Sequence, residues 1–229
     1  MELYECQKCI NHSDKYSSSA IIHTNSKPSV VYDSTSWIPE KTSVLFVSES
    51  PPFHNKKSNI INDSYFYNWC ESQKIFGAPS PLLGTLSWNL FWLLNINNKI
   101  AKKDKLTLFK NKSYYYTTAI KCRVERFNNK IIRNKTVKNC AYFLEKEIEN
   151  TKPNTIVIMG EQALYCLKNC KQFKNKIKSS KINELMKLSI EEPLKLSDTN
   201  LFFISLPLWR NKQHLESVQT IFTKMIRKL

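Results

Sequence analysis

Residues 136–173, TVKNCAYFLEKEIENTKPNTIVIMGEQALYCLKNCKQF, decide the fold. Their first part predicts an amphipathic helix that ends just before Pro153. The buried side of this helix is expected to carry Val137, Tyr142, Leu144 and Ile148. A continuous apolar run follows, NTIVIMG at residues 154–160, which is typical of a buried strand. Residues 161–173 then predict a second helix, so the stretch has the helix–strand–helix order of an α/β protein.

Three further apolar runs predict strands of the same kind. They are SVLFVS at residues 43–48, SYYYTTAIKC at 113–122 and NLFFISLP at 200–207. Helices are predicted over residues 82–94 and from about residue 212 to the end of the chain. Short strands that are apolar throughout and alternate with helices favour a parallel sheet covered on both faces. The sequence thus predicts a three-layer α/β/α fold with a four-stranded parallel sheet.

The remaining segments have less pattern. The first 40 residues are polar and serine-rich, which indicates an irregular arm on a single domain spanning residues 1–229. The lysine-rich section from Lys174 to Ser197 predicts irregular surface structure. Because the carboxyl ends of parallel strands collect the working residues of such folds, function is expected at the four strand ends. These are residues 48–53 (SESPPF), 121–129 (KCRVERFNN), 159–162 (MGEQ) and 205–211 (SLPLWRN).

The chain is strongly basic, with 35 Lys and Arg against 19 Asp and Glu and a formal net charge of +16. A field of this sign attracts polyanions, so nucleic acid is the first partner to consider and an acidic membrane surface the second. No apolar run approaches the length of a membrane span, and the N-terminus lacks the basic and apolar regions of a signal peptide. We therefore expect a cytoplasmic protein that binds nucleic acid and does not enter a membrane.

Four cysteines suggest a metal centre. Cys6 and Cys9 have the Cys-x2-Cys spacing that lets two thiolates bind one metal from a tight turn, and Cys122 and Cys140 follow in the body of the fold. Four thiolates suit either zinc or a [4Fe–4S] cluster. The alternative is a chance pair plus two buried cysteines. Cys166, on the apolar side of its predicted helix, is expected in the core.

Several segments together resemble the uracil-DNA glycosylase superfamily, and specifically its iron–sulfur members in families 4 and 5. VLFVSESPPF at residues 44–53 resembles the first motif, a strand followed by Gly-Glu-Ala-Pro-Gly, and YYTTAIKCR at 115–123 resembles the Asn-Val-Val-Lys-Cys-Arg segment. Residues 139–164 are similar to the helix and strand that come next in the family. The resemblance implies a [4Fe–4S] cluster in preference to zinc, with ligands at Cys6, Cys9, Cys122 and Cys140.

The resemblance also implies catalytic residues. A glycosylase flips its target base out of the duplex, and cleavage of the N-glycosidic bond builds positive charge on the sugar and negative charge on the departing base. A carboxylate beneath the sugar can orient or deprotonate a water. Glu49 aligns with the glutamate of the family's first motif and is the predicted water-directing carboxylate, the alternative being a solvated loop acid. Asp63 is the second candidate.

The family's base-reading residues are replaced in this chain. Thr118 stands where the family has an Asn that binds uracil, and Leu206 stands where its last motif has a His. The stacking Phe of the family has no clear counterpart in GAPSPLLG at residues 77–84. Either the protein is a DNA-binding relic, or its pocket has been rebuilt for another base, which the retained glutamate and cysteines favour. The predicted base pocket consists of Ser50, Pro51, Phe53, Pro81, Leu82, Thr118 and Leu206.

Two segments are predicted to contact DNA. Residues 208–210 lie where family members insert a wedge into the duplex, and Leu208, Trp209 and Arg210 suit that role. A helix-entry loop with a buried Trp209 is the alternative. Cationic side chains next to the cluster predict a phosphate-facing surface, although a solvated basic loop has the same composition. Of these we single out Lys121, Arg123 and Arg126.

The sequence therefore predicts a monomeric, monofunctional DNA glycosylase that acts on duplex DNA and leaves an abasic site. Its substrate is expected to be a modified or damaged base other than plain uracil, such as a hypermodified pyrimidine of phage DNA, which would place the enzyme in antiviral defence. One alternative is an ordinary uracil-DNA glycosylase of base-excision repair. Another is a non-catalytic nucleic-acid-binding protein with a structural metal.

Overall fold

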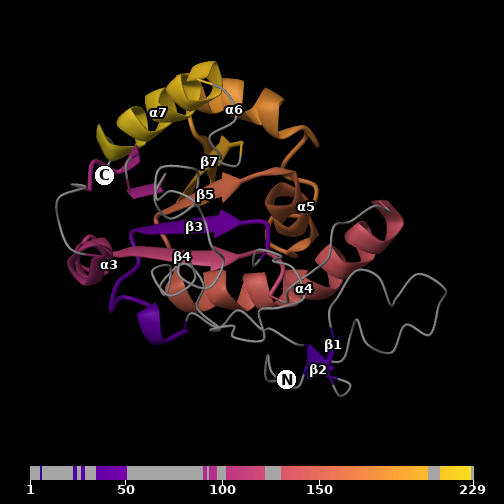
Figure 1. Cartoon of the computed structure of the whole chain (residues 1–229). Coiled ribbons are helices and arrows are strands. Elements are labelled where there is room, and N and C mark those ends of the chain that lie inside the picture. Colours follow the sequence, from indigo (N-terminus) through magenta and orange to yellow (C-terminus); the bar gives the residue numbers. More distant parts are fainter. Residues whose placement is uncertain are drawn as a thin grey trace.

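A mixed five-stranded sheet is flanked by the helices of the chain (Figure 1). The structure, a computed structural model, describes residues 6, 23–24, 27–28, 35–50, 90–91, 93–96, 102–121, 130–205 and 212–227. Four strands are parallel: β3 (Val44–Ser48), β4 (Tyr114–Thr118), β5 (Thr155–Met159) and β7 (Thr199–Ile204). The edge strand β6 (Leu194–Leu196) pairs antiparallel with β7, and the order across the sheet is β4-β3-β5-β7-β6.

The four predicted parallel strands are confirmed. Every residue of β3, β4 and β5 is buried, because helices cover both faces of the sheet and no side of these strands meets water. The fifth strand, β6, was not predicted. Its three residues are only partly buried or exposed, so they lack the apolar run that marks the other strands.

Five α-helices have bounds within the described residues. They are α3 (Lys102–Asn111), α4 (Lys130–Thr151), α5 (Glu161–Asn169), α6 (Ile182–Glu191) and α7 (Lys212–Arg227). The N-terminal part adds the short pair β1 (His23–Thr24) and β2 (Lys27–Pro28) and the 3-10 turn η3 (Thr35–Trp37). A helix was predicted over residues 82–94, of which only the end is described. Leu90, Phe91 and Leu93 are helical there, and their side chains are buried.

Ring contacts of Phe46 in β3 show that α3 and α7 cover one face of the sheet. Its ring stacks on Phe222 of α7 with centroids 6.0 Å apart, and lies 5.8 Å from the ring of Phe109 of α3. Helices α4 and α5 pack against each other on the other face, as right-handed crossovers from β4 to β5 and onward require. Three layers result, as predicted.

Three expectations about the helical segments are wrong. The section from Lys174 to Ser197 contains α6, whose buried residues follow the helical spacing i, i+3, i+4 and i+7. Helix α4 begins at Lys130, ahead of the stretch from residue 136 in which the helix was predicted. Tyr142 is 41% exposed, and Ala141 takes its place on the buried side with Val137, Leu144 and Ile148.

The last described residues of the predicted N-terminal arm contact the domain. Trp37 and Ile38 pack against the core, so the chain joins the domain before β3 begins. Among the described helices, none has the length and apolarity needed to cross a membrane. At the opposite end of β3, the carboxyl ends of the four parallel strands meet at one edge of the sheet, and the candidate site lies there.

Candidate active site

The backbone of Glu49 is fixed at the carboxyl end of β3. The carbonyl of Ser48 accepts a hydrogen bond from the N–H of Ala119 at 2.8 Å, and the carbonyl of Glu49 accepts one from the N–H of Ile120 at 2.9 Å. The ladder between β3 and β4 therefore continues past both strands. Glu49 thus extends from a rigid strand and not from a free loop.

The side chain of Glu49 is held by the first turn of α5. Its Oε1 atom accepts a hydrogen bond from the backbone N–H of Gln162 at 3.2 Å. The N-terminus of a helix carries a partial positive charge and unpaired N–H groups, so it stabilises a carboxylate there. This contact joins residues 113 positions apart in the sequence and orients the carboxylate at the edge of the sheet.

Gly160 provides the space that Glu49 occupies. It lies between β5 and α5 with a φ of 95°, in the left-handed region that favours glycine. A Cβ at this position would lie 2.6 Å from Oε1 of Glu49, which is closer than atoms can approach. The N–H of Gly160 donates to the carbonyl of Ile204 at 3.0 Å, so the glycine is anchored to β7. Only glycine fits here without moving the carboxylate.

Two polar side-chain atoms beside Glu49 are buried without a hydrogen-bond partner. They are Oγ1 of Thr118, at the end of β4, and Oε1 of Gln162. Thr118 is 1% exposed and pairs with Ser48, the residue before Glu49. Across the described chain only Thr42 has another such atom. Burial of an unsatisfied polar atom costs about 1–3 kcal/mol, so the pair next to Glu49 marks a place where a ligand would supply the partners.

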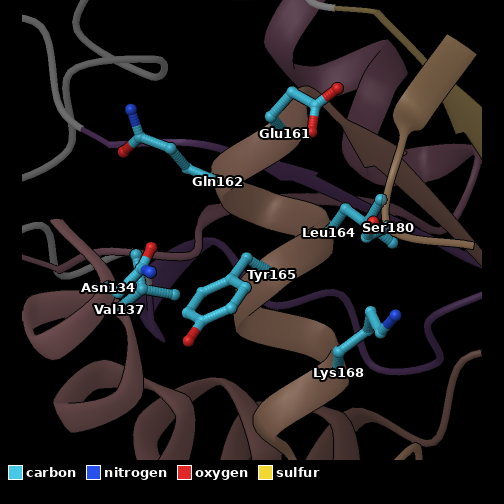
Figure 2. A pocket seen from close by; sticks show the side chains of 8 residues that line it. All are labelled: Asn134, Val137, Glu161, Gln162, Leu164, Tyr165, Lys168 and Ser180. Atoms are coloured by element: carbon cyan, nitrogen blue, oxygen red, sulfur yellow. The ribbon is translucent and has the colours of Figure 1, made fainter. Parts of the chain in front are cut away.

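A cavity of about 410 Å³ begins at Gln162. Its described lining comes from the first half of α4, from α5 and from the segment after α5 (Figure 2). The lining residues are Asn134, Val137, Glu161, Gln162, Leu164, Tyr165, Lys168 and Ser180. This volume is in the range of about 300–1,000 Å³ found for small-molecule sites.

Lys121 does not face solvent, which corrects its predicted role on a phosphate-binding surface. Its side chain is 1% exposed, and its Nζ atom lies 2.7 Å from Oε2 of Glu147 on α4. It also donates to Oγ1 of Thr117 at 2.6 Å. Lys121 therefore joins the end of β4 to α4 through a buried ion pair.

The cysteines of the described chain fall into two groups. Cys6 is half-buried and Cys140 is buried on α4, and neither forms a disulfide with another described residue. Cys166 and Cys170 of the α5 region are fully buried, as predicted for Cys166, and their thiols donate to backbone carbonyls of other segments. Burial raises the pKa of Cys166 well above its usual value, to which the nearby Cys170 and Cys140 add, and burial raises the pKa of Cys170 to about 12.

Most of the predicted site lies outside the described residues. Ser50 is described and half-buried directly after Glu49. The predicted positions outside are Cys9, Pro51, Phe53, Asp63, Pro81, Leu82, Cys122, Arg123, Arg126, Leu206, Leu208, Trp209 and Arg210. Only two of the four predicted ligands, Cys6 and Cys140, are in the described part, which contains no group of three His, Cys, Asp or Glu residues able to hold a metal.

Comparison with known families agrees with this arrangement. The model of the Uracil DNA glycosylase superfamily matches residues 35–229. The chain belongs to the uracil-DNA glycosylase superfamily. No curated protein gives a match. Membership indicates a DNA glycosylase, which hydrolyses the N-glycosidic bond between a base and its deoxyribose.

Sequence reasoning missed two residues that contact Glu49 at this sheet edge, Gly160 and Gln162. Both belong to the strand-end segment 159–162, which was identified as a place of function without a role for any residue in it. Their roles arise from the contact with Glu49 across the sheet edge, and no local pattern encodes that contact.

Proposed function

We propose that this protein is a monofunctional DNA glycosylase that removes a modified or damaged base other than plain uracil and leaves an abasic site. The observation that carries the proposal is the position of Glu49. Its carboxylate stands at the carboxyl edge of a parallel sheet, held by the N–H of Gln162 and accommodated by Gly160. A fixed carboxylate at this edge is what water-directing catalysis requires.

The reaction follows from the charge that develops. Glu49 orients a water beneath C1′ of the flipped nucleotide and accepts one of its protons. The water oxygen forms a bond to C1′ while the N-glycosidic bond breaks, and the bonding electrons leave with the base. The base then takes up a proton, so one water is consumed and a free base and an abasic deoxyribose are formed. Negative charge on Glu49 also stabilises the positive charge on the sugar.

Lys121 supports the monofunctional assignment. A lyase step needs a lysine amine that attacks C1′, and such an amine must reach the sugar as a neutral nucleophile. The amine of Lys121, at the end of β4, is buried against Glu147 and Thr117. It is therefore occupied in holding α4 to the sheet.

Thr118 supports a base other than uracil. A threonine hydroxyl is shorter than the amide of the family's Asn and cannot donate and accept toward one pyrimidine edge in the same way. Its Oγ1 atom is buried without a partner, at the strand end next to Glu49. We propose that the space and the unpaired hydroxyl accommodate a bulkier base, such as a hypermodified pyrimidine of phage DNA, which implies a role in antiviral defence.

The buried position of Cys140 supports a [4Fe–4S] cluster like that of families 4 and 5. Cys140 is buried on α4, two turns from Glu147 on the same helix. Glu147 forms an ion pair with Lys121, the residue directly before Cys122. The chain just before Cys122 is therefore attached to the helix that carries Cys140. We propose that Cys6, Cys9, Cys122 and Cys140 hold the cluster. When bound, it would cross-link the N-terminal arm to the body of the enzyme.

The substitution Glu49→Gln tests the proposed function. It removes the charge and proton-accepting capacity but keeps the shape, so base release should fall at least about 100-fold while affinity for the same duplex stays within twofold. Glu216→Gln, an exposed glutamate on α7, is the matched control and should retain full activity. Equal base release by Glu49→Gln and wild type would refute the assignment of Glu49. DNA binding without base release by either would favour a binding protein.

A further inference from the structure

We infer that the side-chain amide of Gln162 binds the polar edge of the flipped base and thereby determines which base the enzyme accepts. This inference rests on the proposed function and names a residue and a substrate class for it. The amide absent from position 118 at the end of β4 is thus supplied from the other side of Glu49, after β5.

A backbone contact places the side chain of Gln162 close to the carboxylate of Glu49. Because its N–H binds Oε1 of Glu49 at 3.2 Å, its side chain begins directly beside the carboxylate that directs the water. Figure 2 shows that the amide of Gln162 points to the opposite side of α5 from the carboxylate of Glu161, on the side where Asn134 and Val137 lie. Glu161 is engaged elsewhere, since its Oε1 accepts the N–H of Ile182 at 3.2 Å.

The burial of this amide indicates a ligand. Its Oε1 atom is buried and accepts no hydrogen bond, although the side chain lines a cavity of about 410 Å³. The free-energy cost of burying such an atom is recovered when a hydrogen-bond donor reaches it. Thr118, on the strand at the other side of β3, has the second unpartnered atom. One such atom in the first turn of α5 and one at the end of β4, on either side of β3, fit a base whose edge has hydrogen-bonding groups.

The chemistry of an amide narrows the substrate class. A glutamine amide has one donating and one accepting group side by side, and it matches a base edge that presents an acceptor next to a donor. The pyrimidine edge formed by N3 and the C4 substituent has this pattern. The substrate class is therefore a pyrimidine with both groups intact and its modification elsewhere on the ring. Plain uracil presents the same edge, so its proposed exclusion rests on Thr118 and not on Gln162.

Duplexes that differ at one base test this inference. Single-turnover release is measured for 5-hydroxymethylcytosine, 5-hydroxymethyluracil and 2-pyrimidinone, the last of which lacks the C4 substituent. Wild type should release at least one of the hydroxymethylated bases. In Gln162→Ala, which keeps the backbone N–H to Glu49, release of that base should slow about 10- to 100-fold, as expected for the loss of one or two buried hydrogen bonds. Its preference for that base over 2-pyrimidinone should fall at least tenfold.

Two further variants separate recognition from structure. Gln162→Glu has nearly the same shape but no donor, so it should fold as wild type does and also lose at least tenfold in release. Gln172→Ala, an exposed glutamine beyond α5, should behave as wild type. An equal loss on all three bases in Gln162→Ala would overturn the inference, because it would indicate a structural role. Release of neither hydroxymethylated base by wild type, or unchanged release in both Gln162 variants, would overturn it as well. The proposed function fails separately, when Glu49→Gln releases base as fast as wild type.

Discussion

The carboxylate of Glu49 occupies the space in which a side chain at residue 160 would stand. A Cβ on Gly160 would lie 2.6 Å from Oε1 of Glu49, and the backbone there has a φ of 95°. We therefore expect the glycine to act on the proposed reaction through the position of the glutamate. This relationship between the ends of β3 and β5 brings the carboxylate onto the first turn of α5, where the N–H of Gln162 binds it.

The substitution Gly160→Ala should consequently slow base release about 100-fold, because displacement of a reacting group by about 1 Å costs that much. The conformational strain at φ 95° also lowers the melting temperature, so rates are compared well below it. In a protein that already carries Glu49→Gln, Gly160→Ala should slow base release no further, since the carboxylate that Ala would displace is absent. Additive losses in the double variant would contradict the account.

The buried ion pair between Lys121 and Glu147 should contribute to stability and not to DNA affinity. Lys121→Met leaves Glu147, which is 15% exposed, without its partner, and the free energy of unfolding should fall by about 3 kcal/mol in urea titrations. The double variant with Glu147→Leu should recover most of that loss. The matched control is Lys146→Met, which breaks the exposed pair with Glu149 and should leave the unfolding midpoint almost unchanged. A loss of DNA affinity in Lys121→Met without loss of stability would contradict this role.

Much of the fold follows from local sequence. Strands β3, β4, β5 and β7 are continuous apolar runs because both sheet faces are covered, and this is why the parallel sheet could be predicted. Strand β6 could not be predicted, since its pairing with β7 comes from the antiparallel turn at residues 197–198 and not from its three half-exposed residues. The lysine-rich run at residues 174–181, just before α6, concealed the helical spacing that follows it.

The site was predictable only in part. Glu49 was identified because a strand end and a family motif coincide there. The burial of Lys121 was missed because a lysine that follows a strand looks the same in sequence whether it binds phosphate or a partly buried glutamate 26 residues later. The roles of Gly160 and Gln162 were missed because they depend on a contact with a residue more than 100 positions away.

Iron content distinguishes the proposed cluster ligands from the core cysteines. Cys140→Ser removes a ligand, so the purified variant should lose the brown colour and iron that wild type is expected to have. Cys166→Ala removes a thiol that donates to the carbonyls of Ala119 and Val137, and this variant should retain both colour and iron. Equal iron in wild type and Cys140→Ser, or a colourless wild type that contains zinc, would contradict the cluster assignment.

Cys170 should react with iodoacetamide only at high pH. Its folded pKa of about 12, against 9.0 for an ordinary thiol, lowers the thiolate fraction at neutral pH about a thousandfold. Because the thiol is fully buried, the folded protein should be labelled far more slowly than the urea-unfolded chain, whose labelling rate reaches its plateau near pH 9. Because the pKa of Cys170 is higher in the folded state, the unfolded chain loses the thiol proton at a lower pH. The buried thiol therefore lowers the free energy of unfolding as pH rises from about 9 towards 12. Peptide mapping measures the rates, and labelling of Cys170 at equal speed in both states would be inconsistent with its burial.

The most direct test of the central claim is identification by mass spectrometry of the base that the enzyme releases from DNA. The DNA mixture contains uracil, deaminated purines, and hydroxymethylated and glucosylated cytosines. The account predicts release of a modified base, no release of plain uracil, and loss of this activity in Glu49→Gln. Release of uracil alone would contradict the rebuilt pocket, and release of no base at all would contradict the assignment of the protein as an active glycosylase.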